Sequence, residues 1–235
     1  SNNSSVRLLA ESIGAVHLWI GGHADVWGTV EIDQESTFGP FFDGSNDPVI
    51  FFKEGSIFIA GENLTSITAF NDLFQTVFFE DESTYEHRGG PSPHGGIGGV
   101  VSFSQYSNYN IYTTAVSNIL FSGKTYGNIN YYSTNDMTVS SLATAASVFT
   151  FNNFYALDAG ISFLGNDYDA IEITGDLINA EGGGINFTCG QKISFSNTNS
   201  PVYITGPNEI NFAMLGDADF VFVGSGTELI LENDI

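Results

Sequence analysis

Cationic side chains are scarce in this chain. Only 5 Lys+Arg face 27 Asp+Glu among 235 residues, which gives a formal net charge of −22. Such a field repels phosphate backbones and anionic lipid headgroups, so we expect no nucleic-acid partner. No run of about 18 apolar residues exists either, so we expect no membrane insertion through a helix.

Cysteine is almost absent. Cys189 is the only one, which excludes an intrachain disulfide. In a chain of this composition a lone cysteine is expected to behave as a small buried apolar residue rather than as a nucleophile.

Helix signals are missing from most of the chain, because Gly, Asn, Ser and Thr interrupt nearly every window. The exception is the N-terminus, where Val6, Leu9 and Ile13 recur at three- and four-residue steps after Ser5. This spacing predicts a short capping helix over residues 5–13, within an N-terminal cap spanning residues 1–20. An irregular strand is the alternative.

The chain is rich in aromatic rings, with 21 Phe and 10 Tyr, and these alternate with polar residues in short runs that end in Gly, Asn or Asp. One pattern recurs, a β-branched residue, any residue, then Phe or Tyr. The triplets start at Ile50, Val77, Val101, Ile129, Ile161, Ile185 and Ile210. Successive starts are 27, 24, 28, 32, 24 and 25 residues apart.

A step near 25 residues is typical of one coil of a parallel β-solenoid, in which like side chains stack on like because a single coil cannot bury its own apolar face. The triplet at Ile185 recurs at Ile193, about a third of a coil later, which places the two on neighbouring faces of one coil. We therefore predict an all-β fold, a single domain over residues 1–235 built as a parallel β-solenoid (β-helix). The alternative is an antiparallel β-sandwich or jelly roll.

Asparagine is expected at the corners of such coils, where it tolerates the left-handed conformation and can form ladders with its neighbours. The candidates are Asn128, Asn130, Asn152, Asn153, Asn197 and Asn199.

The segments GDLINAEGGGINFT (residues 175–188) and GQKISFS (residues 190–196) resemble the repeats of secreted β-helical adhesin passengers. These include the autotransporter, filamentous-haemagglutinin and polymorphic-membrane-protein types. The resemblance covers about Ile161 to Val223. It implies an extracellular stalk or adhesive surface and carries over no catalytic residue.

Two Asp-x-Asp turns are candidate calcium sites. Residues i and i+2 of an extended turn project to one side, so two carboxylates can converge on a hard cation. The four residues are Asp167, Asp169, Asp217 and Asp219. Neither turn supplies the twelfth-position Glu of an EF-hand, and a solvated turn is the alternative. We expect no cofactor to be required, and calcium is the candidate that these turns offer.

Two further features are candidate ligand contacts, and a third spacing is rejected as a catalytic motif. A Gly/Pro/His loop over residues 86–99 carries His87, Arg88 and His94, which could bind a metal or contact a partner, or simply bulge from one coil. Trp19 and Trp27 could form a sugar-stacking platform if they are exposed, and core residues if they are not. His23 and Asp25 have the spacing of a His–Asp pair, but no Gly-x-Ser-x-Gly elbow supplies a nucleophile for a triad.

The stacking pattern favours a non-enzymatic structural protein, and the resemblance implies an adhesive or structural role outside the cell or at its surface. It would assemble into a homo-oligomer, filament or lattice through exposed strand edges. One alternative is a carbohydrate-binding or polysaccharide-cleaving solenoid, with Asp217 or Asp167 as base and Lys192 as its partner. Another is a viral spike or capsid component.

Overall fold

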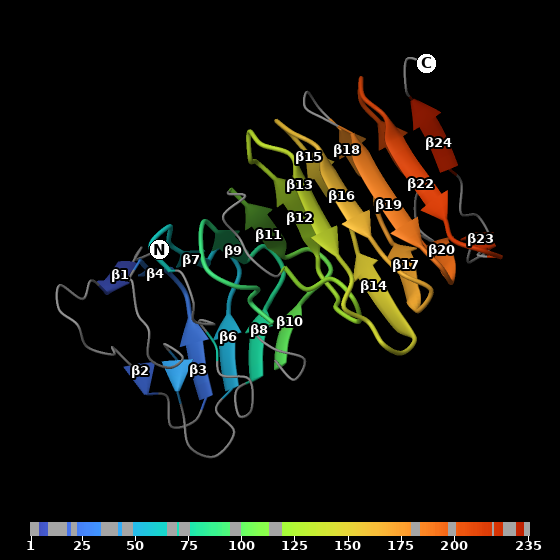
Figure 1. The fold of residues 1–235 in the computed structure, drawn as a ribbon. Coiled ribbons are helices and arrows are strands. Elements are labelled where there is room, and N and C mark those ends of the chain that lie inside the picture. Colours follow the sequence, from blue (N-terminus) through green and yellow to red (C-terminus); the bar gives the residue numbers. More distant parts are fainter. Residues whose placement is uncertain are drawn as a thin grey trace. The chain divides into compact units, whose positions relative to one another are not determined.

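The computed structural model describes residues 5–8, 18–19, 23–33, 42–43, 49–64, 70, 76–94, 100–112, 119–179, 184–196, 201–217, 219–222 and 229–232. The chain divides into two compact units, Ser1–Ile119 (unit 1) and Leu120–Ile235 (unit 2). Each unit is a stack of short parallel strands (Figure 1). Every strand pair found among the described residues is parallel, and partner residues in neighbouring coils are 22 to 28 positions apart.

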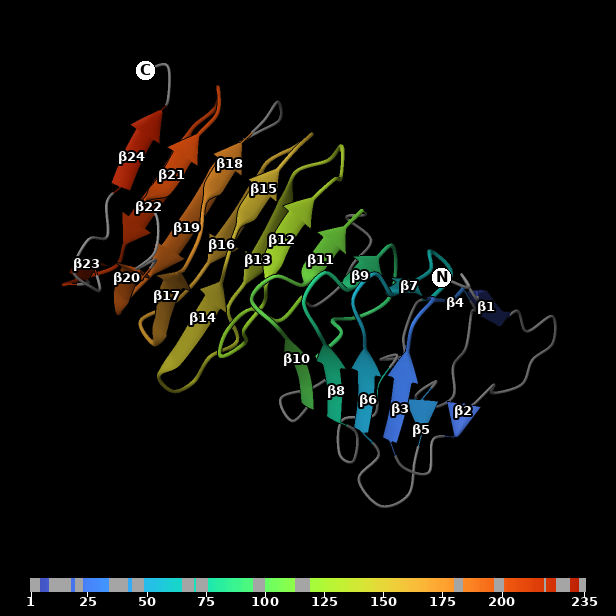
Figure 2. The same ribbon diagram turned by 180° about the vertical axis from the view of Figure 1, so that it is seen from behind.

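Unit 1 has two stacked strand rows and one further pair. Its strands are β1 (Ser5–Leu8), β2 (Leu18–Trp19), β3 (His23–Val26), β4 (Thr29–Ile32), β5 (Phe42–Asp43), β6 (Val49–Phe52), β7 (Ile57–Ala60), β8 (Thr76–Phe79), β9 (Thr84–His87), β10 (Val100–Phe103) and β11 (Asn108–Ile111). One row runs β3-β6-β8-β10 (Figure 2), a second runs β1-β4-β7-β9-β11, and β2 pairs with β5.

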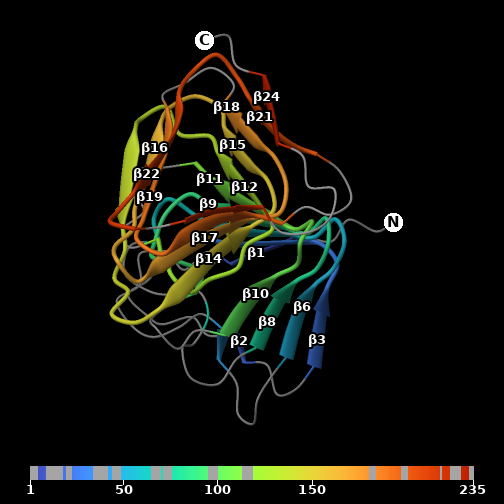
Figure 3. The same ribbon diagram turned by 90° about the vertical axis from the view of Figure 1, so that its right-hand side faces the viewer.

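Unit 2 has three rows, one on each side of the coil. Its strands are β12 (Asn128–Tyr131), β13 (Met137–Ser140), β14 (Ser147–Phe151), β15 (Phe154–Ala156), β16 (Ile161–Leu164), β17 (Asp169–Ile173), β18 (Leu177–Asn179), β19 (Ile185–Cys189), β20 (Lys192–Phe195), β21 (Val202–Thr205), β22 (Ile210–Met214), β23 (Asp219–Phe222) and β24 (Leu229–Glu232). The rows are β12-β15-β18-β21-β24, β13-β16-β19-β22 and β14-β17-β20-β23, which occupy separate sides of unit 2 in Figure 3.

Stacked aromatic rings form the core, since inward positions of successive coils carry the same side-chain type. In unit 1, Phe79 stacks on Phe52 at 4.6 Å and on Phe103 at 4.8 Å between ring centroids. In unit 2, Phe187 stacks on Phe163 at 5.1 Å and on Phe212 at 5.6 Å. Each fully buried ring of this size contributes about 1.5–3 kcal/mol to folding.

The predicted parallel β-solenoid is therefore confirmed, and the antiparallel sandwich is wrong. Ile50, Val77 and Val101 are register partners, as are Ile161, Ile185 and Ile210. Ile185 lies in β19 and Ile193 in β20, so the eight-residue interval marks a change of face as predicted. The triplet at Ile129 lies in β12, in register with Phe154, and belongs to neither ladder of triplets.

The helix predicted over residues 5–13 is wrong where the structure describes it. Residues Ser5–Leu8 form β1, which pairs in parallel with β4 from Ser5↔Thr29 to Leu8↔Ile32. Pairing with β4 supplies the backbone hydrogen bonds that a helix would have formed within the segment. Strand pairing therefore prevails over the weak helical preference of this short apolar pattern. Residues 9–13 lie outside the described residues, as do Asn197 and Asn199.

Asparagines do form a ladder at one corner of unit 2. The Oδ1 atom of Asn128 accepts hydrogen bonds from Nδ2 of Asn152 at 3.0 Å and of Asn153 at 2.8 Å. The backbone N–H of Asp176 in the next coil donates to Oδ1 of Asn153 at 2.7 Å. Asn128 is the first residue of β12, and Asn130 lies inside the same strand rather than at its start. The corner is thus held by side chains that satisfy one another and the backbone of the following coil.

Candidate functional site

The outer face of the β3–β6–β8–β10 row in unit 1 brings charged and aromatic side chains into contact with one another. We call it the outer face, and define it by His23, Asp25, Trp27, Phe51, Lys53, Phe78 and Glu80. Strand alternation places these residues outward, because the intervening Ile50, Phe52, Val77 and Phe79 are at most 1% exposed.

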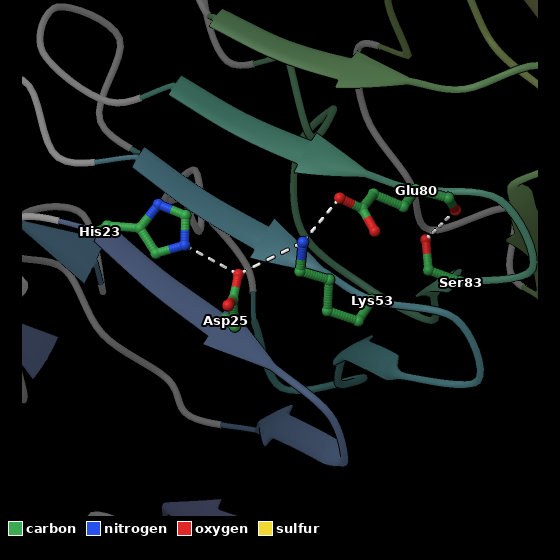
Figure 4. A network of polar contacts seen from close by, with 5 residues as sticks. All are labelled: His23, Asp25, Lys53, Glu80 and Ser83. Atoms are coloured by element: carbon green, nitrogen blue, oxygen red, sulfur yellow. Dashed lines mark hydrogen bonds and ion pairs between the residues drawn. The ribbon is translucent and has the colours of Figure 1, made fainter.

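Charged residues on this face form a chain of contacts across the strands (Figure 4). His23 Nε2 lies 2.9 Å from Asp25 Oδ1, and Lys53 Nζ lies 3.4 Å from the same oxygen. Lys53 Nζ also donates to Glu80 Oε1 at 2.7 Å. Since an ionised carboxylate only accepts, His23 Nε2 carries the proton in this contact.

Lys53 is the centre of that chain and its most enclosed member, with a side chain 19% exposed against 38% for Asp25 and 42% for Glu80. The hydrogen bond to Glu80 is the main reason why the pKa of Lys53 is raised above 10.5, against the opposing effect of desolvation. Desolvation alone would raise the pKa of Asp25, but hydrogen bonds from His23 and Lys53 outweigh it and hold that pKa below 3.8. Lys53 therefore stays charged at neutral pH and is a donor, not a base.

Aromatic rings share the surface with these charges. Phe51 and Phe78 stack at 4.9 Å with an interplanar angle of 13°, and the ring of His23 lies 5.0 Å from that of Phe51. Lys53 Nζ lies over the same ring, 4.6 Å from its centroid. Trp27, which follows β3 directly, is 67% exposed. The arrangement can therefore offer ring faces, hydrogen-bond donors and acceptors to one ligand.

The two predicted calcium turns differ from each other. Asp167 is exposed, whereas Asp169 is 4% exposed and accepts hydrogen bonds from Ser147 Oγ at 2.7 Å and from the backbone N–H of Asn166 at 2.8 Å. Burial alone would raise the pKa of Asp169, but its hydrogen-bond donors hold it below 3.8. Asp217 and Asp219 are both exposed, with Asp219 in β23.

Asp169 also borders a half-open pocket in unit 2. Phe121, Phe149 and Phe163 form its apolar side, and Ser122 and Ser141 lie beside the carboxylate. Among the described residues, the structure brings no three His, Cys, Asp or Glu side chains into a cluster that could hold a metal ion. Calcium binding stays a prediction.

The Gly/Pro/His loop is more enclosed than its composition indicates. Glu86 and His87 belong to β9, so the irregular segment starts at Arg88. His87 is 0% exposed and contacts Tyr109 Oη at 2.6 Å and the Gly90 carbonyl at 3.0 Å, so both ring nitrogens are occupied. His94 is 2% exposed and packs edge-on to Phe103, with ring centroids 5.8 Å apart.

Arg88 is the accessible cation of this loop. Its Nη2 atom donates to Glu86 Oε2 at 2.6 Å, and the guanidinium lies 5.4 Å from the ring of Tyr112. Of the three predicted residues, His87 and His94 are thus buried, and Arg88 forms an ion pair with Glu86 at the surface. A role for them in binding a partner or a metal stays a prediction.

Of the two predicted sugar-stacking residues, Trp27 is exposed on the outer face, while Trp19 lies in β2 and its side chain is outside the described residues. The prediction missed Lys53, Glu80, Phe51 and Phe78. A signal for them exists in the sequence, because FFKEGS (residues 51–56) and FFEDES (residues 78–83) align one coil apart with Lys opposite Glu. Cys189 is buried, as predicted.

The fold places the chain in the class of parallel β-solenoid proteins. No family model matches the chain, and no match was found among the curated proteins or the solved structures. In the described part of the chain, no helix offers an apolar stretch of membrane-spanning length.

Proposed function

We propose that the chain is a non-enzymatic structural or adhesive protein that acts outside the cell or at its surface. It associates with further copies through open strand edges of its solenoid. The resemblance of residues 161–223 to secreted β-helical passengers supports the location. The uneven burial of the successive coils of unit 2 supports the association.

The inward side chains of unit 2 are covered in the middle coils and less so in β22. In β19, Ile185, Phe187 and Cys189 are all 0% exposed. Their register partners in β22 include Ile210 and Phe212, which are only half-buried. Apolar surface of this kind is stabilised when a further layer covers it.

Phe220 in β23 marks the same open side. It is 44% exposed, although its ring contacts Phe195 at 5.6 Å and Phe212 at 5.4 Å. Within the described residues, β22 and β23 each have a strand partner on one side only. Unpaired strand edges are templates for another strand, and a second copy offers strands of the same period.

The substitution Phe220→Ser tests this proposal. We expect the wild type to form oligomers whose mass grows with protein concentration. Because Phe220→Ser removes apolar surface from the open side, the variant should need an at least about tenfold higher concentration to reach the same mass. Size-exclusion chromatography with light scattering measures the mass. The matched control is Leu142→Ser, which removes an apolar side chain that is 68% exposed and lies outside both edge strands. A wild type that stays monomeric at all concentrations contradicts the proposal.

A further inference from the structure

The outer face defined above has an order that points to a ligand. The backbone ladder continues past the strand ends, because N–H groups of Lys53, Glu80 and Ser104 donate to Val26, Phe52 and Phe79 respectively. Trp27, Lys53, Glu80 and Ser104 therefore follow one another in a row across the four strands, at one end of each.

Exposed aromatic residues occur at both ends of this row, since Trp27 is its first member and Tyr106 comes two residues after its last member, Ser104. Trp27, 67% exposed, follows β3, and Tyr106, 55% exposed, follows β10 shortly after Ser104. Four strands at the usual spacing put the two outer strands roughly 14 Å apart. Exposed flat rings carried by the two outer strands can stack on two different units of an extended ligand, whereas buried rings of the core cannot.

The side chains between the two rings are polar, and two carboxylates share a single cation. Asp25, Lys53 and Glu80 form one ion chain, with Lys53 only 3.4 Å and 2.7 Å from its two acidic partners. The free lone pairs of the carboxylates accept hydrogen bonds from hydroxyl groups. The ion chain also fixes the geometry of these groups before a ligand binds, which lowers the entropic cost of binding.

Charge decides which ligand fits. A formal net charge of −22 opposes anionic polymers, and the single cation of the row is already paired. A polycation would use the excess of acid, but it would gain little from Trp27 and Tyr106 together. A ligand with many hydroxyl groups, apolar ring faces and no charge uses every feature of the row.

From this arrangement we infer that the outer face of unit 1 binds a neutral glycan chain lying across β3, β6, β8 and β10. Trp27 and Tyr106 stack on its sugar rings, and Asp25, Lys53 and Glu80 hydrogen-bond its hydroxyl groups. The inference rests on the proposed adhesive function and gives that function a ligand class. It does not depend on self-association.

Affinity electrophoresis in native gels tests the inference, with hydroxyethyl cellulose and galactomannan as neutral glycans and polygalacturonate as the anionic one. We expect at least one neutral glycan to retard the wild-type chain and polygalacturonate to have no effect. Trp27→Ala and Tyr106→Ala should each weaken retardation about tenfold or more, the usual effect of truncating an aromatic residue central to an interface. The affinity of Trp27→Phe should lie between that of the wild type and that of Trp27→Ala.

The control is Tyr168→Ala, which removes an exposed aromatic ring from unit 2 and should bind as the wild type does. Unchanged circular dichroism and Tm exclude misfolding of the variants, since all three rings are at the surface. Equal binding by Trp27→Ala and the wild type, retardation by polygalacturonate alone, or no retardation by either neutral glycan overturns the inference.

The two proposals fail separately. Trp27→Ala should leave the oligomer mass unchanged, and Phe220→Ser should leave glycan retardation of the monomer unchanged. A wild type that stays monomeric but is retarded by a neutral glycan removes the assembly proposal alone. A wild type that associates but is retarded by neither neutral glycan removes the glycan site alone.

Discussion

His87 shows how a residue with the chemistry of a ligand becomes part of the core. Its ring is fully buried in β9, and the Gly90 carbonyl can only accept, so Nε2 carries the proton and Nδ1 accepts from Tyr109 Oη. Burial lowers the pKa of His87 from 6.5 to about 4, although hydrogen bonds to backbone groups of the loop oppose the shift. The folded chain therefore holds this ring neutral.

The free energy of unfolding should consequently depend on pH because of His87. Between pH 6.5 and about 4 the unfolded chain binds a proton that the folded chain excludes, so the free energy of unfolding falls as the pH drops through this window. A shift of this size corresponds to about 3 kcal/mol, lost in full below pH 4. Urea denaturation at pH 7, 5.5 and 4 measures it.

The variant His87→Phe isolates this contribution, because all carboxylates titrate in both proteins. At pH 7 the variant should be less stable than the wild type, since it leaves the Tyr109 hydroxyl and the Gly90 carbonyl without the ring. As the pH falls, the difference should shrink by about 3 kcal/mol. A difference that stays constant from pH 7 to pH 4 contradicts the assignment of His87 as the acid-sensitive group.

At the scale of the coil, some corners require glycine because two backbones approach closely. Gly206 follows β21 with φ of +126°, and a Cβ added there would lie 1.7 Å from the Asn179 carbonyl oxygen of the preceding coil. Gly216, in the turn between β22 and β23, also has a positive φ of +63°, but a Cβ there meets nothing within 4 Å. The first glycine is required by packing and the second only by conformation.

These two corners give a paired prediction. Gly206→Ala should lower the free energy of unfolding by at least about 2 kcal/mol, because the strained conformation and the backbone clash act together. Gly216→Asn should change it by less than about 1 kcal/mol, since Asn tolerates the left-handed region. Thermal and urea unfolding measure both. Equal losses in the two variants would show that the approach of Gly206 to Asn179 is not tight.

The coil-to-coil register was predictable from the sequence, because stacking requires like residues at a fixed step. Ile50, Val77 and Val101 show this directly, being both repeated in sequence and paired in space. The position of the Ile129 triplet was not predictable. It has the same residue pattern as the others but lies in β12, on another face of the coil, in register with Phe154. The β1 strand was missed because its partner β4 lies outside any local window.

The candidate site was only partly predictable, since its members depend on neighbours one coil away. The sequence leaves Trp27 open between an exposed stacking residue and a core residue, and the structure shows that it is exposed. Lys53 and Glu80 belong to no sequence motif. They are 27 residues apart in the chain, and only the fold brings them within a hydrogen bond of 2.7 Å. Asp167 and Asp169 show the converse, because neighbours in sequence end in different environments, one exposed and one buried.

For the whole molecule, charge acts against the proposed assembly. Copies with a formal net charge of −22 repel one another, while the apolar side chains of β22 and β23 favour contact. Repulsion between surface charges is screened within a Debye length of about 10 Å at 0.1 M salt. Association should therefore be governed by ionic strength.

We expect the apparent association constant to rise by about tenfold or more between 10 mM and 300 mM NaCl, because screening removes repulsion and leaves apolar burial intact. Sedimentation velocity at fixed protein concentration measures this. CaCl2 at matched ionic strength tests the acidic turns. Association that is stronger in CaCl2 than in NaCl, and that the double variant Asp217→Asn/Asp219→Asn abolishes, indicates bridging by calcium. Identical association in the two salts shows that calcium acts only by screening charge. Association that weakens as NaCl increases contradicts the proposed apolar contact and points to ion pairs between copies.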